Sequence, residues 1–441
     1  MPSQQVAVIG GGIAGISAAL ELSQHNLDIH LIEKSPFLGG HAIHYTCKAN
    51  GACQHCNACL VQEQLKKLNK ADNVHLHLAS QLQGIQKKEG TYFLETKQSP
   101  LFESKEEQEA LKALANTEGW ENLVQRGPSR HNIPLYTLDW SRMEGSTAPS
   151  VTLPEPANGL DLNKKERSEL IQAEAIVLAS GFHPFDPHRI ETYNYSSLSN
   201  VVSALDMEKI RRTRGYHLRP SDNIPPRRIA FIQCVGSRNT SHGNLWCSRV
   251  CCPYALRMAR AMQAEQPQSE ITFFYMDLQN CDREPEKTLN TCRSNFRFVR
   301  MMPVDILPGK NDSVIIRYMS REATIKEDHF DLVVLSVGME PGADSASLAR
   351  MFDIGLNRHG FFRTASEGDR TTLPEKGIFP AGAATGPKNI VESMEQATEA
   401  VKDLLTHISS QEKKDHGYER SLVFHTNIDH RHERDRSYRS P

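Results

Sequence analysis

Short apolar runs and segments with helical periodicity alternate along most of the chain, a pattern that predicts an α/β protein with parallel sheets and covering helices. The first run, Val6–Ile9, predicts a strand, and Ile16–Ser23 predicts a helix. A second apolar run, Leu27–Ile32, predicts another strand. Strand, helix and strand in this order are typical of the first unit of a dinucleotide-binding domain.

A glycine-rich turn, Gly10-Gly11-Gly12-Ile13-Ala14-Gly15, connects the first strand to the helix, and Glu33 follows the second strand. In this G-x-G-x-x-G pattern the first glycine permits a tight turn, and the second lets the backbone approach a pyrophosphate. The third glycine lets the helix pack closely on the strand, and Glu33 can accept hydrogen bonds from a ribose. The pair Gly39-Gly40 resembles flavoproteins with two dinucleotide-binding domains, which favours FAD over NAD.

Further runs predict how the chain continues. A buried strand is expected at Ala173–Gly181, and a second α/β unit begins with a strand at Arg228–Gln233 and a helix at Tyr254–Met262. The turn Gly377–Asn389 opens a long helix, Ile390–Leu405. The amides at the start of that helix would face the flavin ring and stabilise negative charge on it. Other helices are expected at residues 108–115 and 202–210, and other strands at residues 271–276, 313–318 and 332–336.

A proline-rich linker at residues 219–226 marks the predicted entry to the second domain. We therefore predict an FAD-binding domain formed by residues 1–218 and 341–408, and a second, inserted α/β domain at residues 219–340. Residues 97–171 are polar, include Pro154-Glu-Pro156, and are interpreted as an insertion in the first domain. Residues 409–441 are rich in His and Arg and predict a flexible tail.

Composition narrows the class of protein. The 441 residues are enough for two or three domains, and 39% apolar with 24% charged residues suits a globular enzyme. A formal net charge of −2 gives no field that favours nucleic acid. No apolar run approaches the roughly 18 residues of a membrane helix, and the N-terminus has no signal-peptide pattern, so we expect a cytoplasmic protein without membrane insertion.

Eight of the ten cysteines fall in two tight groups, which indicates metal or redox chemistry in a reducing compartment. The first group, Cys47, Cys53, Cys56 and Cys59, has the short spacings that suit thiolate ligation of an iron–sulfur cluster. A structural zinc site and redox-active thiols beside the flavin remain alternatives. The two isolated cysteines, Cys281 and Cys292, are interpreted as ordinary buried thiols.

The second group, Cys234, Cys247, Cys251 and Cys252, occupies the strand–loop–helix position where a nicotinamide-binding domain would carry its phosphate loop. A helix N-terminus favours the thiolates that bind iron. Adjacent ligands strain the backbone, so Cys252 could be replaced by a cysteine of the first group. A packed loop of reduced core cysteines is the alternative. Because the loop lacks a glycine cradle, direct NAD(P)H oxidation is disfavoured.

Four stretches together resemble the flavin-carrying A subunit of the heterodisulfide reductase family. They are Cys234-Val-Gly-Ser-Arg238, Cys247–Cys252, Asp331–Met339, and Gly377–Gly382 with Gly386-Pro-Lys388. The resemblance covers roughly residues 5–95 and 170–405. It implies a thioredoxin-reductase-like fold with FAD and one [4Fe–4S] cluster, or two. The ferredoxin-type inserts of the methanogen form are missing, and the chain is closer in length to the shorter forms of sulfur oxidisers and of the quinone-modifying complex of sulfate reducers. Ala383 replaces an aspartate common in FAD enzymes, which fits the family.

The resemblance also implies roles for residues. Lys388 and Glu208 are the expected catalytic residues: a cation near the flavin favours the reduced ring, while Glu208 and Asp206 align loosely with an acidic segment of the family. The expected cluster ligands are the second cysteine group, with the first group as ligands of another cluster. The expected FAD-binding residues are Gly10, Gly12, Ile13, Ala14, Gly15, Glu33, Lys34, Gly39, Gly40, His41, Ala179, Ser180, Gly181, Gly382, Ala383, Lys388, Asn389 and Ile390.

We therefore predict an oxidoreductase subunit that passes electrons between FAD, cluster and partners in sulfur metabolism. The partners would be other heterodisulfide-reductase-like subunits and an electron carrier, and the family alone suggests a homodimer. An NAD(P)H-dependent disulfide reductase with a Cys53/Cys56 or Cys56/Cys59 dithiol is one alternative. A scaffold that binds zinc and FAD without turnover is another.

Overall fold

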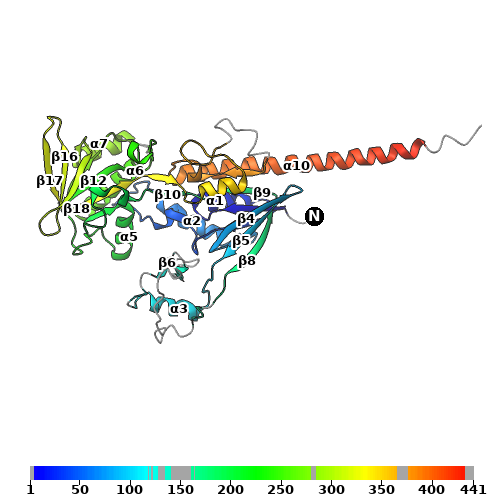
Figure 1. Cartoon of the computed structure of the whole chain (residues 1–441), viewed down its shortest axis with the longest axis horizontal. Helices are drawn as coiled ribbons and strands as arrows, with labels where there is room; N and C mark the ends of the chain where they lie inside the picture. Colours follow the sequence, from blue (N-terminus) through cyan, green and yellow to red (C-terminus); the bar gives the residue numbers. More distant parts are fainter. Residues whose placement is uncertain are drawn as a thin grey trace, which may run out of the picture.

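The structure is a computed structural model (Figure 1). The residues that it describes are 4–117, 119–120, 123–127, 135–140, 160–162, 164–279, 285–364 and 376–432. Pro154-Glu-Pro156 and Cys281 lie outside this part of the chain. In the described part, no helix combines the length and the apolar character needed to cross a bilayer.

A five-stranded parallel sheet forms the first half of the molecule. In spatial order its strands are β20 (Ile378–Pro380), β9 (Ala175–Leu178), β1 (Gln4–Ile9), β2 (Leu27–Ile32) and β3 (Val74–His77). One face packs on α1 (Ile13–Leu22) and α10 (Ile390–His432) through a buried cluster that includes Val8, Leu31 and Leu404. The predicted strand–helix–strand unit is therefore present, and α2 (Ala58–Leu68) also contacts α1.

The opposite face of this sheet is covered by an antiparallel sheet of β4 (Ser80–Lys88), β5 (Thr91–Gln98) and β8 (Arg167–Ala173). The strands alternate apolar and polar side chains, so Leu94 and Ile171 turn inward onto Ile9 and Ile32. Helix α8 (Ser345–Phe352) adds Leu348 and Phe352 to the same cluster.

The second half of the molecule contains another parallel sheet. Its first strand comes before the proline-rich linker, residues 219–226, that was predicted to mark the entry to this half. In spatial order its strands are β11 (Val201–Ser203), β18 (Leu332–Val337), β12 (Arg228–Val235), β13 (Glu270–Phe274) and β14 (Arg297–Val299). Strand β11 precedes the linker and pairs with β18, but its three residues are too short to show an alternating pattern. The helices of this half are α5 (Ala204–Arg214), α6 (Cys251–Glu265) and α7 (Pro285–Asn295).

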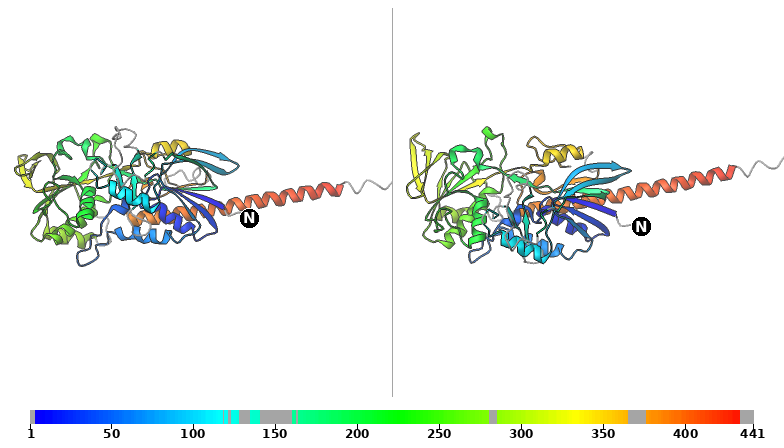
Figure 2. Two further views of the ribbon diagram at one scale, coloured as in Figure 1. Left: turned by 90° about the horizontal axis from the view of Figure 1, so that it is seen from below. Right: turned by 60° about the horizontal axis from the view of Figure 1, so that its bottom comes forward.

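An antiparallel sheet of β15 (Pro303–Pro308), β16 (Val314–Met319) and β17 (Ile325–Phe330) covers the outer face of the second sheet. The two halves lie side by side along the long axis of the molecule (Figures 1 and 2). Two short strands connect them, β10 (Phe182–Pro184) and β19 (Met339–Pro341), and these strands pair with each other in antiparallel fashion.

The segment interpreted as a polar insertion has a small core of its own. Helix α3 (Lys105–Leu114) starts with a capping box between Ser104 and Glu107, and β6 (Val124–Gly127) pairs with β7 (Leu135–Leu138). Buried side chains from these elements and from the turn between α3 and β6, among them Leu111 and Trp120, pack together. The sequence pattern did not predict this core, because the segment is highly charged overall. Its apolar positions lie on one face of a helix whose other face is solvated.

Helix α10 differs from the prediction at its end. The pattern predicted a helix to Leu405 and a flexible tail from residue 409, whereas the helix continues to His432 and projects beyond the sheets (Figure 1). Residues 433–441 lie outside the described part. Short 3-10 helices complete the described fold: η1 (Gly40–His44), η3 (Pro187–Arg189), η4 (Glu191–Tyr193), η5 (Thr240–His242) and η7 (Gly382–Thr385).

Candidate functional site

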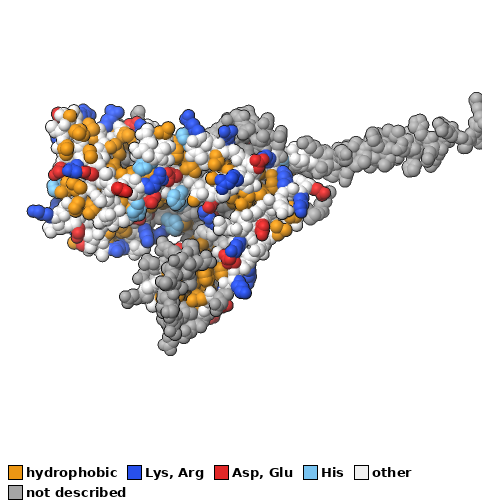
Figure 3. Space-filling model, viewed as in Figure 1, with side chains coloured by type: hydrophobic (Ala, Val, Ile, Leu, Met, Phe, Trp, Pro, Cys, Tyr) orange, Lys and Arg blue, Asp and Glu red, His pale blue; other side chains and the backbone are white. Residues whose placement is uncertain are grey.

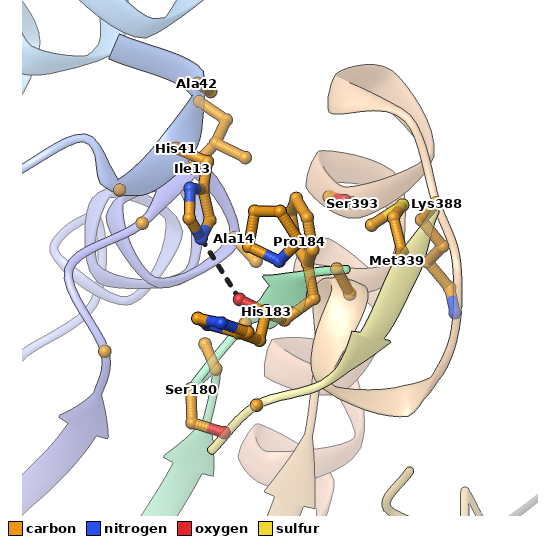
Figure 4. Close-up of a pocket in the computed structure, with 18 of the residues that line it drawn as sticks. Ile13, Ala14, His41, Ala42, Ser180, His183, Pro184, Met339, Lys388 and Ser393 are labelled. Carbon is orange, nitrogen blue, oxygen red and sulfur yellow. Dashed lines mark hydrogen bonds between the residues drawn. The ribbon is translucent and has the colours of Figure 1, made fainter. Parts of the chain in front are cut away.

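A cavity of about 600 Å³ lies where the two halves of the molecule meet. Its walls come from the β1–α1 turn, the segment after β2, the end of β9, the β19 turn, and the first residues of α6 and α10. All but two of the residues expected to bind FAD line it: Gly10, Gly12, Ile13, Ala14, Glu33, Lys34, Gly39, Gly40, His41, Ala179, Ser180, Gly181, Ala383, Lys388, Asn389 and Ile390. Figure 4 shows several of these side chains around the cavity.

The two exceptions, Gly15 and Gly382, do not line the cavity but allow close packing behind it. A Cβ atom on Gly15 would lie 1.8 Å from the carbonyl oxygen of Gly10, and one on Gly382 would lie 2.4 Å from the Cβ atom of Ala14. Gly12 differs, because a Cβ atom there would meet no protein atom closer than 4.0 Å. The missing side chain of Gly12 therefore keeps free space in the cavity, as close approach of a pyrophosphate requires.

Glu33 stands at the end of β2 and faces the turn. Its carboxylate accepts hydrogen bonds from the Gly11 amide at 2.5 Å and from the Ser35 amide at 2.7 Å. Burial raises the pKa of Glu33 even though both bonds oppose the shift. Across the cavity, the Ser180 hydroxyl is buried and has no hydrogen-bond partner among the described residues. A buried polar atom without a partner suits a ligand with hydroxyl or phosphate groups, so this wall fits a dinucleotide.

Two histidines lie at the cavity wall, His41 in η1 and His183 in β10. His41 Nε2 lies 3.1 Å from the Phe182 carbonyl, the contact drawn as a dashed line in Figure 4. Burial lowers the pKa of His41, so the neutral ring donates this bond at pH 7. His183 and Met339 also line the cavity. No sequence pattern indicated these two, because each belongs to a three-residue connecting strand, β10 or β19.

Helix α10 begins at the cavity with a reciprocal cap. The Asn389 amide donates to Glu392 Oε2 at 2.9 Å, and the Glu392 amide donates to Asn389 Oδ1 at 2.9 Å. Lys388 Nζ donates to Thr385 Oγ1 at 2.8 Å. The cavity wall thus has a helix N-terminus and an ammonium group side by side, and both stabilise negative charge on a ligand.

The cysteine loop between β12 and α6 is folded tightly. Cys234 has a positive φ of 58° at a register shift in the β12–β18 ladder. Ser237 Oγ and Ser248 Oγ lie 2.5 Å apart and join the two ends of the loop, and Ser248 Oγ also accepts from the Met339 amide at 2.7 Å. Gly236 has a φ of 74°, and a Cβ atom on it would lie 2.0 Å from the Phe185 ring.

This packing lies at the carboxyl ends of β12 and β18, where Ser336, Val337 and Gly338 also line the cavity. Open parallel sheets bind nucleotides at the point where the strand order reverses, and β12 lies at that point in the second sheet. Asn244 Nδ2 crosses the loop and donates to the Gly236 carbonyl at 2.9 Å. The residues of the loop thus form a closed turn rather than a glycine-rich phosphate cradle. That this chain does not oxidise NAD(P)H directly stays a prediction.

The four thiols of the loop lie within electrostatic reach of one another. Burial raises the pKa of Cys234 to about 12, and Cys252 and Cys247 add to the shift. Cys251 donates a hydrogen bond to Cys252, which raises the pKa of Cys251 and lowers that of Cys252. Both adjacent cysteines stand in the first turn of α6, as predicted.

A thiol-rich loop of this kind has the donor chemistry of an iron–sulfur site, since thiolates are the usual ligands. Within the described ranges, however, no three Cys, His, Asp or Glu side chains are arranged so that they could hold a metal ion. The four side chains would have to turn toward a common centre on binding. Thus the donor set fits a cluster, while the positions of the ligand atoms do not define one.

Residues 45–57, which connect η1 to α2, are called the first cysteine segment. Cys47, Cys53 and Cys56 lie in this segment, and Cys59 lies at the start of α2. Burial and Glu63 raise the pKa of Cys59, and the neighbouring Cys56 and Cys47 contribute to the shift. Cys47, Cys53 and Cys59 are exposed, while Cys56 lines the cavity. Cys251 of the second group lines the same cavity. Both thiol groups therefore border the space that fits the dinucleotide.

Arg249, within the stretch Cys247–Cys252, also lines the cavity. Its guanidinium donates to Glu392 of α10 at 2.7 Å, so the cysteine loop is tied to the helix that starts beside Lys388. A lone arginine between two cysteines gives no signal of a partner 143 residues away.

Glu208, expected to be catalytic, does not line the cavity. Its carboxylate is 1% exposed, forms an ion pair with Lys48, and accepts from the Thr46 amide at 2.9 Å and from the Tyr254 hydroxyl at 2.8 Å. Burial alone would raise the pKa of Glu208, but Lys48 and the other donors outweigh burial and lower it. These contacts give Glu208 a role in holding the first cysteine segment against α5 and α6. Of the isolated cysteines, Cys292 is fully buried, as predicted.

Comparisons with known proteins agree with this geometry. The family described as "NAD(P)-binding Rossmann-like domain" matches residues 8–63, which include the glycine-rich turn and the first cysteine group. The chain is 27% identical over 417 residues to the A subunit of a ferredoxin/F(420)H(2)-dependent CoB-CoM heterodisulfide reductase of Methanosarcina acetivorans, covering 90% of this chain and 52% of that protein. It is 28% identical to an iron-sulfur A subunit of CoB–CoM heterodisulfide reductase of Methanopyrus kandleri, covering 93% of this chain and 65% of that protein.

The chain thus spans between about half and two thirds of the length of these relatives. Among solved structures, thioredoxin reductase of T. acidophilum superposes with a TM-score of 0.53 at 14% identity, covering 92% of this chain and 99% of that one. Thioredoxin reductase of Lactococcus lactis gives 0.52, also at 14% identity, with 92% and 100% covered. The predicted thioredoxin-reductase-like fold is confirmed, and similarity along nine tenths of the sequence shows that this chain is related to the A subunits of heterodisulfide reductases.

Proposed function

We propose that this chain is an electron-transfer subunit that carries FAD and at least one [4Fe–4S] cluster in a heterodisulfide-reductase-like complex of sulfur metabolism. The observation that supports this most is the shared cavity: all but two of the residues expected to bind FAD line it, and so do Cys56 and Cys251 of the two thiol groups. A flavin in this cavity would lie close to both groups without any rearrangement of the sheets.

The residues of the chain have separate tasks in this proposal. The glycine turn and the N-terminus of α1 bind the pyrophosphate, and Glu33 binds the ribose. Lys388 and the amides at the start of α10 stabilise negative charge on the reduced ring. FAD supplies two-electron and one-electron chemistry when it is bound, which is what a subunit between different carriers requires. The cysteines would hold the cluster, with Cys234, Cys247, Cys251 and Cys252 as the preferred ligands.

Partner proteins follow from the same proposal. The relatives are named as A subunits of larger reductases, and some of their names include ferredoxin. We infer that this chain likewise exchanges electrons with companion subunits and with a carrier protein rather than with free NAD(P)H, because the cysteine loop has no glycine-rich turn to bind a pyrophosphate.

A single substitution tests the flavin site. Gly12 has a φ of −75°, so alanine is compatible with its backbone, and a Cβ atom there touches no protein atom closer than 4.0 Å. We expect Gly12→Ala to fold like the natural protein but to lose most of its flavin, because the new methyl group occupies the pyrophosphate space. Flavin absorbance per chain and circular dichroism are the measurements. Full flavin content in the variant would contradict this placement.

The cluster is tested by anaerobic purification. We expect iron and acid-labile sulfide in a ratio near one. We also expect an electron paramagnetic resonance signal after reduction, which the variant Cys251→Ser should abolish. One zinc per chain with no iron would favour the scaffold alternative. A protein without iron whose flavin is bleached rapidly by NADPH would favour the disulfide reductase.

A further inference from the structure

The first cysteine segment is held against the second half of the molecule by arginines. Arg211 Nη1 of α5 donates to the Cys47 carbonyl at 2.9 Å, and Arg257 Nε of α6 donates to the Gln54 carbonyl at 2.9 Å. Both contacts come from helices of the second half to the segment that follows η1. Figure 2 shows this segment beside those helices. Cys47 and Cys53 of this segment and Cys59 at the start of α2 are exposed.

The end of α5 is strongly basic. Its last six residues read Lys-Ile-Arg-Arg-Thr-Arg and contain no acid. Lys209, Arg212 and Arg214 of this run are exposed, and Lys and Arg side chains appear on the surface over α5 in Figure 3. We call these three residues the α5 basic face.

The guanidinium of Arg212 keeps its charge in this setting. Its Nη1 atom contacts His44 Nδ1 at 2.8 Å, and burial together with Arg212 lowers the pKa of His44 to about 4. A neutral imidazole accepts the hydrogen bond but does not neutralise the cation. Among the described residues, Lys209 and Arg214 form no ion pair.

The nearby acids turn away from this surface. Glu208 is buried against Lys48, and Glu265 accepts from Arg211 at 3.0 Å and from His217 at 2.8 Å. The α5 basic face is therefore a local positive region on a chain whose formal net charge is −2. A positive region of this kind attracts an acidic protein and raises its association rate, especially at low salt.

We propose that the α5 basic face, beside the exposed thiols of the first cysteine segment, is the docking surface for an acidic one-electron carrier protein. The inference rests on the proposed function and names the side from which the carrier approaches. The segment is suited to this contact because it spans from the surface, at Cys47 and Cys53, to the cavity wall, at Cys56. In each encounter the carrier is oxidised by one electron and the cofactor site of this chain is reduced by one, with no bond formed or broken.

The test uses the full chain, purified without oxygen, and a reduced acidic [2Fe–2S] ferredoxin as the probe. Stopped-flow absorbance gives the second-order rate of flavin reduction at several salt concentrations. The variant Lys209→Glu/Arg214→Glu reverses two exposed charges of the basic face. Its matched control, Lys310→Glu/Lys326→Glu, reverses two exposed lysines, one in the β15–β16 turn and one on β17, and changes the net charge equally.

We expect the basic-face variant to react about tenfold more slowly at low salt and to lose most of its salt dependence, while the control stays within about twofold of the natural protein. Reduction by dithionite, which needs no docking, should be equal in all three. Equal rates of flavin reduction by ferredoxin in the two variants would overturn the proposal. Binding of a DNA duplex to the basic face would also overturn it, if the charge reversal leaves the rate of reduction by ferredoxin unchanged. Absence of flavin and iron from the natural protein would instead refute the proposed function.

If the double reversal impairs folding, Lys209→Gln/Arg214→Gln removes the charges without introducing new ones. A smaller loss of rate in the same direction, with normal flavin content, supports the surface. An unchanged rate and salt dependence in this variant refutes it.

Discussion

The ion pair between Lys48 and Glu208 offers a sharp test of how the first cysteine segment is held. The Lys48 and Glu208 side chains are 2% and 1% exposed, and Glu208 also accepts from Thr46 and Tyr254. Glu208→Gln preserves the shape and one acceptor oxygen but leaves the Lys48 ammonium buried without a counter-charge. Loss of one partner of a buried pair costs about 3–5 kcal/mol.

We therefore expect Glu208→Gln to lower the free energy of unfolding by about 3 kcal/mol or more, measured by urea unfolding followed by circular dichroism. A matched control is the surface pair of Lys97 and Glu166, whose side chains are 46% and 43% exposed. Glu166→Gln should cost less than about 1 kcal/mol. The double variant Lys48→Met/Glu208→Gln should recover part of the loss, because it removes both charges.

A local readout separates this mechanism from general destabilisation. Lys48 follows Cys47 directly, so release of the segment should raise the rate at which the Cys47 thiol is alkylated in iron-free protein well below the urea transition. A Glu208→Gln variant that unfolds within about 1 kcal/mol of the natural protein, with unchanged Cys47 labelling, would show that the pair does not anchor the segment.

Three further outcomes follow from the structure. Burial, His77 and His75 lower the pKa of His30 from 6.5 to about 4, so the unfolded chain takes up the proton first. The contribution of His30 to stability is complete above pH 6.5 and should fall by about 1 kcal/mol toward pH 4, after allowance for solvent exposure. His30→Asn should remove this share of the pH dependence in urea titrations, while the shares of His41 and His44 remain. Gly236→Ala should cost more than about 2 kcal/mol in unfolding free energy, because φ is positive and the methyl group overlaps the Phe185 ring; an unchanged urea midpoint would refute this. In iron-free protein, iodoacetamide should modify exposed Cys47 at least about 100-fold faster than buried Cys234, as mass spectrometry would show; equal rates would contradict the burial.

The parts of the site that the sequence predicted are those in which neighbouring residues act together. The glycine turn, Glu33 and the start of α10 are each contained in one short stretch whose pattern reflects backbone geometry. Such patterns place Gly12 and the start of α10 at the cavity before any tertiary contact is known, while the place of Lys388 there was implied by the family resemblance. The same reasoning placed Cys251 at a helix N-terminus, because Pro253 and the apolar periodicity that follows mark the first turn.

The remaining features depend on contacts between distant segments, which leave no local signal. The partner of Arg249 is on α10, and the partner of Glu208 is in the first cysteine segment. Strand β11 is only three residues long, so its place in the second sheet is determined by β18 rather than by its own pattern. His183 reaches the cavity only because β10 pairs with β19.

The pairing of β10 with β19 has a mechanical consequence. The two connecting strands form a single two-stranded ribbon between the halves of the molecule. Phe182 pairs with Pro341 at one end of the ribbon, and Pro184 pairs with Met339 at the other. A ribbon bends more readily than it stretches, so it opposes sliding of the halves past each other more than it opposes tilting. The Lys48–Glu208 and Arg249–Glu392 pairs add further links between the halves that a tilt would have to strain. Phe182 and Met339 are also part of the cavity wall, so any such tilt changes the shape of the space where the flavin is proposed to lie.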